Sequence, residues 1–515
     1  MKRFLSRSFL LFLLSLSIAI AQGNLAKLTI LHWNDFHSQN VPTRISKKSE
    51  DGTKKDVMVG GAAYLKAYID KYKSESEQTL TLHAGDDFQG TPISTITKGF
   101  SQIEILNLIK PDVMAIGNHE FDYGADNLRA LFPKTTFPII SANIFDNSKG
   151  ATFLPQFKIE QRGSLKIGVI GLAPMDLHRL TFRENVKGLD ILDAEKTAKQ
   201  VIHELRKKND CNMIVVLSHM GIEEDSSLAA NVDGIDVIIG GHSHTTLRHP
   251  KRVNGVVICH AGSKGRYLGK LDLTYDLEKS KVIQSDGNLI ELLNDGVTPD
   301  ASVAQKVAEL EKQVDVALNE VIGTLEVNWV RGGTRETNVG NWQADVIRDY
   351  AQADVAFQNS GGIRKNMNAG PITVRDMWEI APFGNEFAKF RVTGAQLRSM
   401  IEWQHSYAKG ELCQVSGIKY IIDNGKAKGS RLVQIEVGGK PVDPKREYLI
   451  ATNNYISGHL YDTFGLPEKE ITVEPMLPPQ LDRDVFIEYV KKQQRISSKV
   501  EGRIIIKGDK EHESD

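Results

Sequence analysis

The side chains best suited to chemistry in this sequence are histidines, aspartates and one asparagine that come directly after short apolar runs. They are Asp35 and His37 after 28–33, Asp86 after 79–83, Asn118 and His119 after 112–116, His219 after 212–218, and His242 and His244 after 235–240. Strand ends on one edge of a sheet converge in space, so these side chains can form one cluster. Mixed His, Asp and Asn ligation suits borderline cations such as Zn²⁺ or Mn²⁺. No Cys belongs to the set, which argues against a structural zinc site.

Each of these motifs is weak on its own, because a single His beside a strand is more often a hydrogen-bonded core residue. A purely structural role for all of them would require unrelated coincidences at five strand ends. The neighbouring glycines, as in Gly240-Gly241-His242, permit tight turns and a close approach of the backbone. We therefore predict a metal site at these strand ends.

The elements that must position these residues are short strands alternating with helical patterns. The predicted strands lie at 28–33, 79–83, 112–117, 137–140, 165–172, 212–218, 235–240 and 256–260. Over a first domain of residues 24–298, this alternation indicates an α/β fold or a β-sandwich flanked by helices.

A connecting helix and a second α/β domain are predicted after this region. Apolar residues recur with helical spacing over 299–321, at Val303, Val307, Leu310, Val314, Ala317 and Val321. Thr298-Pro299-Asp300 supplies a helix start signal. The second domain is expected over 322–508, followed by a charged tail at 509–515.

The first 21 residues have the composition of a secretory signal. Lys2, Arg3 and Arg7 precede an apolar run that ends in Ala19-Ile20-Ala21, which is the order of a basic region, an apolar region and an A-x-A cleavage site. The run is too short to span a bilayer comfortably. We expect cleavage near Ala21, export to the periplasm or the extracellular space, and no stable membrane anchor.

Bulk composition narrows the class of protein further. With 41% hydrophobic and 25% charged residues, the chain has an ordinary globular composition. Its formal net charge of −1 offers no electrostatic footprint for a nucleic-acid polymer. The three cysteines, Cys211, Cys259 and Cys413, allow at most one internal disulfide, and we expect all three to be buried.

Several longer motifs carry a resemblance to a known family. LTILHWNDFHS, AGDDFQG, IGNHEFD, LSHMG and GGHSH occur in this order in the first half, and NSGGIR (359–364) and PFGN (382–385) occur in the second. The sequence resembles the calcineurin-like metallophosphoesterases and, within them, the 5′-nucleotidase and UDP-sugar hydrolase family. The resemblance covers nearly all of the chain after the signal. It implies an N-terminal four-layer α/β/β/α metallophosphoesterase sandwich, a connecting helix and a C-terminal α/β substrate-binding domain.

The resemblance also implies two divalent cations (Zn, Mn or Co) that share Asp86. The implied ligands are Asp35, His37, Asp86 and His244 for one cation, and Asp86, Asn118, His219 and His242 for the other. Two cations about 3.5–4 Å apart lower the pKa of a bound water, so that a metal-bound hydroxide can attack phosphorus. In the family pattern His119 is not a ligand and donates to the phosphate as charge develops. Asp122 matches the partner that orients this His, and the alternative for Asp122 is a residue of a surface turn.

For the second domain the resemblance implies a nucleoside pocket. Its matched residues are Phe383 and Tyr455 as two rings that sandwich the base, Arg364 on the phosphate, Asn359 and Asn385 facing the base, and Asp462 on the ribose. Two departures weaken this match. The stretch Ser457–Asp462 is one residue longer than the family's glycine-rich stretch, and another phosphate-binding arginine of the family falls on Gly333, between Arg331 and Arg335. Tyr455 and Asp462 could instead be ordinary core and turn residues.

The function that the sequence favours is therefore that of an exported two-metal 5′-nucleotidase, which converts nucleoside 5′-monophosphates to nucleoside and phosphate. Nucleotide sugars or 2′,3′-cyclic nucleotides are further substrates to consider. The expected partner is a small-molecule nucleotide, and the sequence leaves the oligomeric state open. Two alternatives are a thiosulfohydrolase of the same fold, against which Arg364 and Phe383 count, and a non-catalytic nucleotide-binding protein, against which the full ligand set counts.

Overall fold

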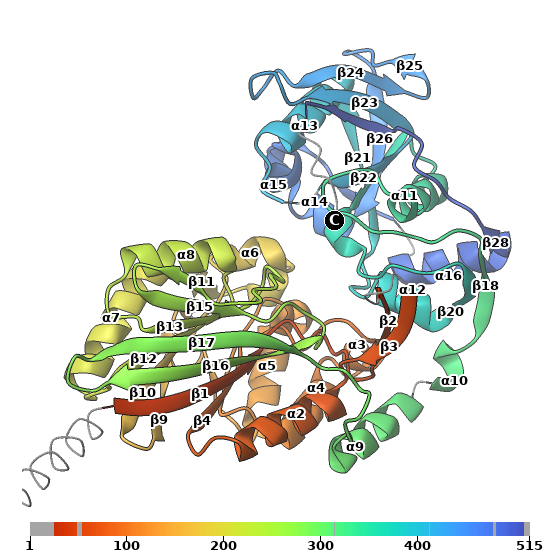
Figure 1. The fold of residues 1–515 in the computed structure, drawn as a ribbon. Coiled ribbons are helices and arrows are strands. Elements are labelled where there is room, and N and C mark those ends of the chain that lie inside the picture. Colours follow the sequence, from red (N-terminus) through yellow and green to blue (C-terminus); the bar gives the residue numbers. More distant parts are fainter. Residues whose placement is uncertain (1–24, 49–53, 314, 411, 477–479, 509–515) are drawn as a thin grey trace, which may run out of the picture. The chain divides into compact units, whose positions relative to one another are not determined.

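The computed structural model describes residues 25–48, 54–313, 315–410, 412–476 and 480–508 (Figure 1). The predicted secretory signal and the predicted tail at 509–515 lie outside these residues. The described chain divides into two compact units: unit 1 contains the residues up to 89 and 96–311, and unit 2 contains 90–95 and the residues from 312 onward. Among the described residues no helix combines the length and the apolar character needed to cross a membrane.

Unit 1 is built on two six-stranded sheets. The first has the order β17-β16-β1-β4-β5-β6, formed by Lys281–Glu291, Tyr267–Asp276, Leu25–Trp33, Thr79–His83, Val113–Ala115 and Ile139–Ile140. The second has the order β14-β15-β13-β12-β10-β9, formed by Lys251–Val253, Val256–His260, Val237–Gly240, Met213–Ser218, Leu165–Leu172 and Phe157–Arg162. Strands β1, β4, β5 and β6 are parallel to one another, as are β10, β12, β13 and β15. Their carboxyl ends therefore gather at one edge of each sheet.

The main core of unit 1 lies between the two sheets. Leu28 and Ile30 of β1 belong to the same buried apolar cluster as Val169 of β10 and Val215 of β12. Val216, the next residue of β12, belongs instead to the cluster that includes residues of helices α7 (Ala194–Lys207) and α8 (Ile222–Asn231). Successive strand residues point to opposite faces, so one run of apolar residues serves both layers. This explains why these strands read as continuous apolar segments rather than alternating ones.

Helices cover the outer faces of the paired sheets (Figure 1). Helices α7 (Ala194–Lys207) and α8 (Ile222–Asn231) lie on one side, and α2 (Ala62–Ser74) and α4 (Phe100–Ile109) lie on the other. Helix α7 shows how sequence produces this layer: the side chain of Asp193 accepts the Lys196 N–H at 2.7 Å and caps the helix. Its buried stripe is Ala194, Ala198, Val201, Ile202 and Leu205. The predicted four-layer α/β/β/α architecture is confirmed.

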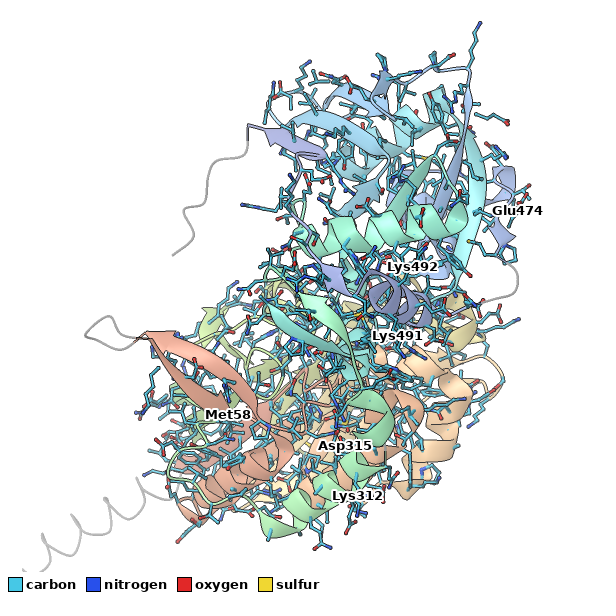
Figure 2. All side chains as sticks on the ribbon, turned by 90° about the vertical axis from the view of Figure 1, so that its right-hand side faces the viewer. Met58, Lys312, Asp315, Glu474, Lys491 and Lys492 are labelled. Carbon is cyan, nitrogen blue, oxygen red and sulfur yellow. The ribbon has the colours of Figure 1, made fainter. Side chains whose placement is uncertain are left out.

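Smaller elements complete unit 1. They are the hairpin β2 (Thr43–Lys48) and β3 (Lys54–Val59), the sheet of β7 (Ile144–Asp146), β8 (Ala151–Thr152) and β11 (Leu189–Ile191), the helices α5 (Ala125–Leu131) and α6 (Leu177–Leu180), and the 3₁₀ turns η1 (His119–Tyr123), η2 (Phe132–Lys134) and η3 (Arg183–Val186). The short helix α3 (Pro92–Ile96) follows β4 in the chain, and all of it except Ile96 belongs to unit 2. Met58, which Figure 2 labels on β3, is 40% exposed.

The segment predicted as one connecting helix over 299–321 is divided differently in the structure. Helix α9 spans Ala301–Lys312, a separate helix α10 spans Asp315–Leu318, and strand β18 already begins at Val321 (Figure 2 labels Lys312 and Asp315). Val303, Val307 and Leu310 of the predicted stripe are buried on α9, whereas Val321 is 62% exposed. Val321 pairs with Thr373 of strand β20 (Gly370–Thr373), so a partner distant in sequence overrides the helical spacing at this end.

Unit 2 is also an α/β structure. Its strands are β22 (Cys413–Ser416), β19 (Val355–Asn359), β26 (Glu447–Asn453), β21 (Phe387–Thr393) and β27 (Glu474–Pro475) in one sheet, β25 (Lys440–Pro441), β24 (Leu432–Val437), β23 (Ile418–Asp423) and β29 (Ile504–Lys507) in a second, and β20 (Gly370–Thr373), β18 (Val321–Leu325) and β28 (Arg495–Ile496) in a third. Its α-helices are α10, α11 (Asn338–Ala351), α12 (Val374–Ile380), α13 (Gly394–Ser406), α14 (Asn454–Ser457), α15 (Leu460–Phe464) and α16 (Asp482–Gln493), and its 3₁₀ turns are η4 (Ser360–Gly362) and η5 (Glu468–Glu470). Capping boxes at Thr373 and Thr393 begin α12 and α13.

All three cysteines of the chain are buried and none forms a disulfide. Burial raises the pKa of Cys259 and of Cys413 to about 12. They behave as small apolar core residues.

Candidate functional site

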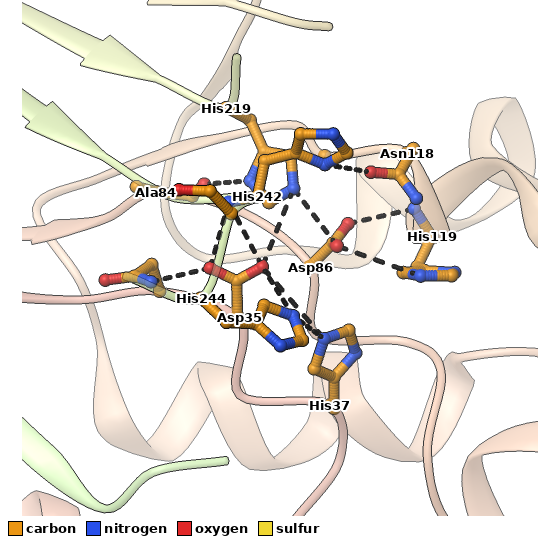
Figure 3. A network of polar contacts seen from close by, with 12 residues as sticks. Asp35, His37, Ala84, Asp86, Asn118, His119, His219, His242 and His244 are labelled. Atoms are coloured by element: carbon orange, nitrogen blue, oxygen red, sulfur yellow. Dashed lines mark hydrogen bonds and ion pairs between the residues drawn. The ribbon is translucent and has the colours of Figure 1, made fainter. Parts of the chain in front are cut away.

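Five strand ends of unit 1 carry the residues that the sequence singled out. Strands β1, β4 and β5 of the first sheet lead into Asp35 and His37, Asp86, and Asn118 and His119, while β12 and β13 of the second sheet lead into His219, and His242 and His244. Figure 3 shows these side chains turned toward one another. The structure therefore brings all seven predicted ligands and His119 into one cluster.

One half of the cluster gathers around Asp35, whose side chain is fully buried. The Nε2 atoms of His37 and His244 lie 3.0 Å apart, and His244 Nε2 lies 3.4 Å from an Asp35 oxygen. Asn34 holds the second Asp35 oxygen, because its side-chain N–H donates to Oδ2 at 2.6 Å. Two imidazoles and one carboxylate thus direct their lone pairs to a common point.

The other half gathers around Asp86. His219 Nε2 lies 3.0 Å from Asp86 Oδ2, and His242 Nδ1 lies 3.0 Å from Asn118 Oδ1. His219 Nδ1 lies 2.5 Å from the carbonyl oxygen of Ala84. A carbonyl can only accept, so Nδ1 carries the proton and Nε2 is left to face the cluster.

The donor set fits divalent cations. Three groups of side chains each bring donor atoms within 4.8 Å of one another: Asp35 with His37 and His244, Asp86 with His219 and His242, and His37 with Asp86 and His119. Neutral imidazoles, carboxylates and an amide oxygen are ligands for Zn²⁺ and similar ions. The first two groups each contain three residues of one implied ligand set. Asp86, which the resemblance implies for both cations, belongs to the second group and, with His37, to the third.

Backbone strain marks the same residues. Five of the predicted ligands have φ between 50° and 73°: Asp35, His37, Asp86, His242 and His244. Such left-handed conformations cost on the order of 1–3 kcal/mol each for residues other than glycine and persist where the surroundings enforce them. A Cβ atom at Gly117 would lie 2.2 Å from Asp86 Oδ1, so only glycine permits this approach of the loops.

The ionisable groups of the cluster shift one another's pKa values. Burial opposes ionisation of Asp35, but the hydrogen bond from His244 and the charge of His219 bring its pKa below the ordinary value. Burial likewise opposes ionisation of Asp86, but the charges of His219 and His119 hold its pKa well below the ordinary range. Burial would lower the pKa of His219, yet the charge of Asp86 raises it to about 10. The buried carboxylates therefore require positive charge beside them, which a bound cation also supplies.

His119 stands at the rim of the cluster with a partner of its own. Its Nδ1 lies 2.8 Å from Asp122 Oδ2, and its Nε2 lies 4.0 Å from Asp86 Oδ2. Asp122 is mostly buried, with 12% of its side chain exposed. The carboxylate accepts a hydrogen bond from the Nδ1–H group and thereby fixes the orientation of the ring, which directs Nε2 toward the cluster.

Glu120 is a positioning residue that the sequence reasoning did not single out. Its side chain is fully buried and accepts three backbone N–H groups: Gly117 at 2.7 Å, Asp86 at 3.0 Å and Asp87 at 2.6 Å. One carboxylate thereby ties the loop after β4 to the loop after β5. The available signal was its place in the IGNHEFD motif, directly after His119.

Three further buried histidines of unit 1, His32, His83 and His260, lie outside the three groups. His83 contacts Asp87 at 2.9 Å and His260 contacts Asp225 at 2.8 Å, and all four side chains are buried. Burial lowers the pKa of His32 to about 3, so it is a neutral core residue.

Candidate substrate contacts in unit 2 gather at one edge of its five-stranded sheet. Asn359 ends β19, Tyr455 follows the end of the parallel neighbour β26, and Asn385 precedes the antiparallel strand β21. Asn453, the last residue of β26, links two of these segments, because its side-chain N–H donates to Asn359 Oδ1 at 2.8 Å. The strand order therefore places three separate motifs at a common edge.

The other predicted substrate contacts of unit 2 lie on different segments. The Arg364 guanidinium lies 5.7 Å from the centre of the Phe383 ring, within cation–π range. The Tyr455 ring lies 4.7 Å from the ring of His459, and Asp462 lies on the next helix, α15. Of the two arginines that flank Gly333, Arg331 donates to the Arg364 carbonyl at 3.3 Å, whereas Arg335 is exposed.

Comparisons with known proteins agree with this arrangement. The calcineurin-like phosphoesterase family model matches residues 28–246, and the model of the 5′-nucleotidase C-terminal domain matches residues 321–465. The chain is 30% identical over 553 residues to the 5′-nucleotidase of Mus musculus, covering 96% of this chain and 93% of that protein. It is also 30% identical over 507 residues to Endonuclease YhcR of Bacillus subtilis (strain 168), covering 93% of this chain but only 41% of that longer protein. The crystal structure of a 5′-nucleotidase precursor from Thermus thermophilus superposes with a TM-score of 0.86 at 28% identity, covering 94% of this chain and 100% of that one.

Proposed function

Because the chain belongs to the 5′-nucleotidase family of metal-dependent phosphoester hydrolases, we propose that it hydrolyses nucleoside 5′-monophosphates to nucleoside and inorganic phosphate. The observation that carries the proposal is the joint presence of the metal-binding cluster in unit 1 and of Phe383, with the Arg364 guanidinium 5.7 Å from its ring centre, in unit 2. A phosphatase without base selection would need only the cluster. An aromatic ring beside an arginine guanidinium suits a substrate that joins a flat base to a phosphate, because the ring can stack on the base and the guanidinium can pair with the phosphate.

Two divalent cations, when bound, would activate water and neutralise charge on the phosphate. Asp35, His37 and His244 would hold one cation, Asn118, His219 and His242 the other, and Asp86 would contribute to both. His119 would donate from Nε2 to a phosphate oxygen as negative charge develops there, since Asp122 accepts its Nδ1 proton.

The unit 2 residues would bind and orient the substrate. Arg364 would pair with the phosphate, while Phe383 and Tyr455 would stack on the two faces of the base. Asn359 and Asn385 would hydrogen-bond the base edge, and Asp462 would accept from the ribose hydroxyls. The overall change breaks the P–O bond to the 5′ oxygen, which takes up a proton, and forms a new bond from water oxygen to phosphorus.

The test is phosphate release from AMP by the purified full-length protein, with and without a chelator. Matched reactions contain p-nitrophenyl phosphate, UDP-glucose, 2′,3′-cyclic AMP or a thiosulfonate, and an Asp86→Asn preparation controls for contaminating phosphatase. We expect chelator-sensitive hydrolysis of AMP that the Asp86→Asn preparation lacks. Hydrolysis of the thiosulfonate without hydrolysis of AMP would replace the proposal with the thiosulfohydrolase alternative. Binding of AMP without any turnover would replace it with the binding-protein alternative.

Export belongs to the same proposal. The basic and apolar segments before Ala21 support a cleaved secretory signal. Expression of the full chain, followed by fractionation and N-terminal sequencing, should yield a periplasmic or secreted protein that starts near Gln22. An intact Met1 in the cytoplasmic fraction would contradict this.

A further inference from the structure

A buried carboxyl group in unit 2 has no part in the reaction described above. Asp482 is the first residue of α16, and only 2% of it is exposed. Its Oδ2 accepts the side-chain N–H of Asn385 at 3.2 Å, and its Oδ1 accepts the backbone N–H of Arg483 at 2.7 Å. Asn385 is itself 3% exposed. A buried carboxylate is costly unless it is paired or hydrogen-bonded, so its presence behind Asn385 requires an explanation.

The contact belongs to a wider connection between the start of α16 and the PFGN segment. The backbone N–H of Asp482 donates to the Asn385 carbonyl at 2.6 Å, and Glu386 forms an isolated β-bridge with Leu481. The Arg483 guanidinium lies so close to Gly384 that a Cβ atom there would be 2.9 Å from its Nη1. Gly384 has φ +62°, which glycine adopts without strain. Helix α16 therefore holds the segment that carries Phe383 and Asn385.

The chemistry of this contact is directional. An ionised carboxylate only accepts hydrogen bonds, so it must face the nitrogen end of the Asn385 carboxamide. Rotating the carboxamide by 180° would place its oxygen against the carboxylate. Asp482 thus permits one of two orientations that a free Asn side chain would populate almost equally.

We propose that Asp482 is a specificity-determining residue, which fixes the Asn385 carboxamide so that the protein distinguishes a 6-amino purine nucleotide from a 6-oxo purine nucleotide. The inference rests on the proposed function, in which Asn385 meets the base. Adenine carries an amino donor at position 6, and hypoxanthine carries a carbonyl acceptor on the same purine frame. A carboxamide held in one orientation matches one of these groups and opposes the other. A carboxamide free to rotate matches either.

The ionisation of Asp482 supplies a second way to examine the same contact. Burial raises the pKa of Asp482 to about 7, while the hydrogen bond from Asn385 and the charge of Arg483 oppose this rise. Below this pH the protonated carboxyl group has an O–H that can donate to the Asn385 oxygen. The orientation of the carboxamide is then no longer restricted.

The experiment compares kcat/KM for AMP and IMP in the metal-loaded full-length protein. Wild type should prefer one of the two by about tenfold, the effect of one mismatched buried hydrogen bond. Asp482→Asn can donate as well as accept, so its AMP/IMP ratio should lie within about twofold of one. Asp484→Asn is the matched control, because Asp484 is exposed on the same helix turn and undergoes the same chemical change. Its ratio should equal that of wild type.

Two further measurements keep the result interpretable. Hydrolysis of p-nitrophenyl phosphate at the wild-type rate shows that Asp482→Asn is folded and holds its metals. In wild type, the AMP/IMP ratio should approach one as the pH is lowered from 8 to 6. The ratio is independent of any titration that affects both substrates equally. An unchanged ratio in Asp482→Asn and across pH, or no preference in wild type at pH 8, would overturn the inference while leaving the nucleotidase proposal intact. If wild type hydrolyses neither AMP nor IMP but still cleaves the aryl phosphate, the proposed function itself is overturned.

Discussion

The candidate ligands of unit 1 and three of the candidate substrate contacts of unit 2 lie at sheet edges, but the backbones of the two sets differ. Five of the seven ligands have positive φ, whereas none of Asn359, Arg364, Phe383, Asn385, Tyr455 and Asp462 does. Cation ligands must converge within a few tenths of an ångström, while a ring that stacks on a base tolerates looser placement. Strain is therefore concentrated where the chemistry demands fixed positions.

Burial differs in the same direction for most of these side chains, although 32% of the His244 side chain is exposed in unit 1 and Asn385 is buried in unit 2. Asp35 and His219 of unit 1 are fully buried, and Asp86 is 2% exposed. In unit 2, Arg364, Phe383 and Tyr455 remain partly exposed. The first region resembles a preformed core whose buried carboxylates require positive charge beside them, and the second resembles a surface that substrate would complete.

The sharpest way to break this comparison is to remove the charge at the centre of unit 1. Asp86→Asn should lose both cations, because this carboxylate is grouped with His219 and His242 of one proposed ligand set and with His37 of the other. Phosphatase activity should then fall by at least about 10³-fold, the scale expected when metal activation is lost. Chelation of wild type should have the same effect, and Mn²⁺, Co²⁺ or Zn²⁺ should restore wild type but not the variant. Full activity in a sample shown by elemental analysis to be free of metal would disprove the two-cation mechanism.

The next effect tests whether every histidine of the cluster is a ligand. His119→Ala should retain both cations, because His119 has Asp122 as its own partner. Its kcat for AMP should drop by about 10²–10⁴-fold with a smaller change in KM, as for a group that acts in the transition state. Elemental analysis and steady-state kinetics decide this. If the variant binds fewer cations than wild type, His119 belongs to the ligand group that it shares with His37 and Asp86.

A smaller effect is expected from the region with relaxed backbone. Phe383→Ala, and separately Tyr455→Ala, should raise KM for AMP by roughly tenfold through lost stacking. Hydrolysis of p-nitrophenyl phosphate should change little, because that substrate lacks a nucleobase. The measurement is KM for both substrates in each variant. Equal increases in KM for the two substrates would mean that these rings have a structural role. The contrast between a fixed site in unit 1 and a more loosely placed one in unit 2 would then be wrong.

The smallest effect concerns the stability of unit 2. Burial raises the pKa of Asp482 to about 7, compared with about 4 in an unfolded chain. The folded chain therefore holds a proton that the unfolded chain releases, so this contribution is complete below about pH 4 and is lost as pH rises through 7. Asp482→Asn should remove this dependence and be more stable than wild type at pH 8 by about 1–3 kcal/mol.

Tryptophan fluorescence can follow this unfolding selectively, because four of the five tryptophans, all except Trp33, lie in unit 2. The unfolding midpoint of wild type should fall between pH 5 and pH 8 by more than that of Asp482→Asn, with Asp484→Asn as the control. Parallel curves for wild type and Asp482→Asn would show that the buried carboxyl group stays ionised throughout.

Local sequence determined much of this protein. The runs at 79–83 and 165–172 became strands with the predicted bounds, because apolar β-branched segments between turn residues have few other folds. Their polar ends identified the cluster residues, since strand ends of parallel sheets share an edge. The four-layer architecture and the family followed from the same motifs.

Contacts between distant segments decided the rest. The helix predicted through Val321 ends earlier, because β18 gains backbone hydrogen bonds from β20 about fifty residues away. Glu120 is distinguished from any other acidic residue only by the three N–H groups that surround it, and Asp482 only by Asn385, 97 positions earlier. Periodicity and spacing report local preference, whereas the role of a buried polar group depends on partners that only the folded chain brings to it.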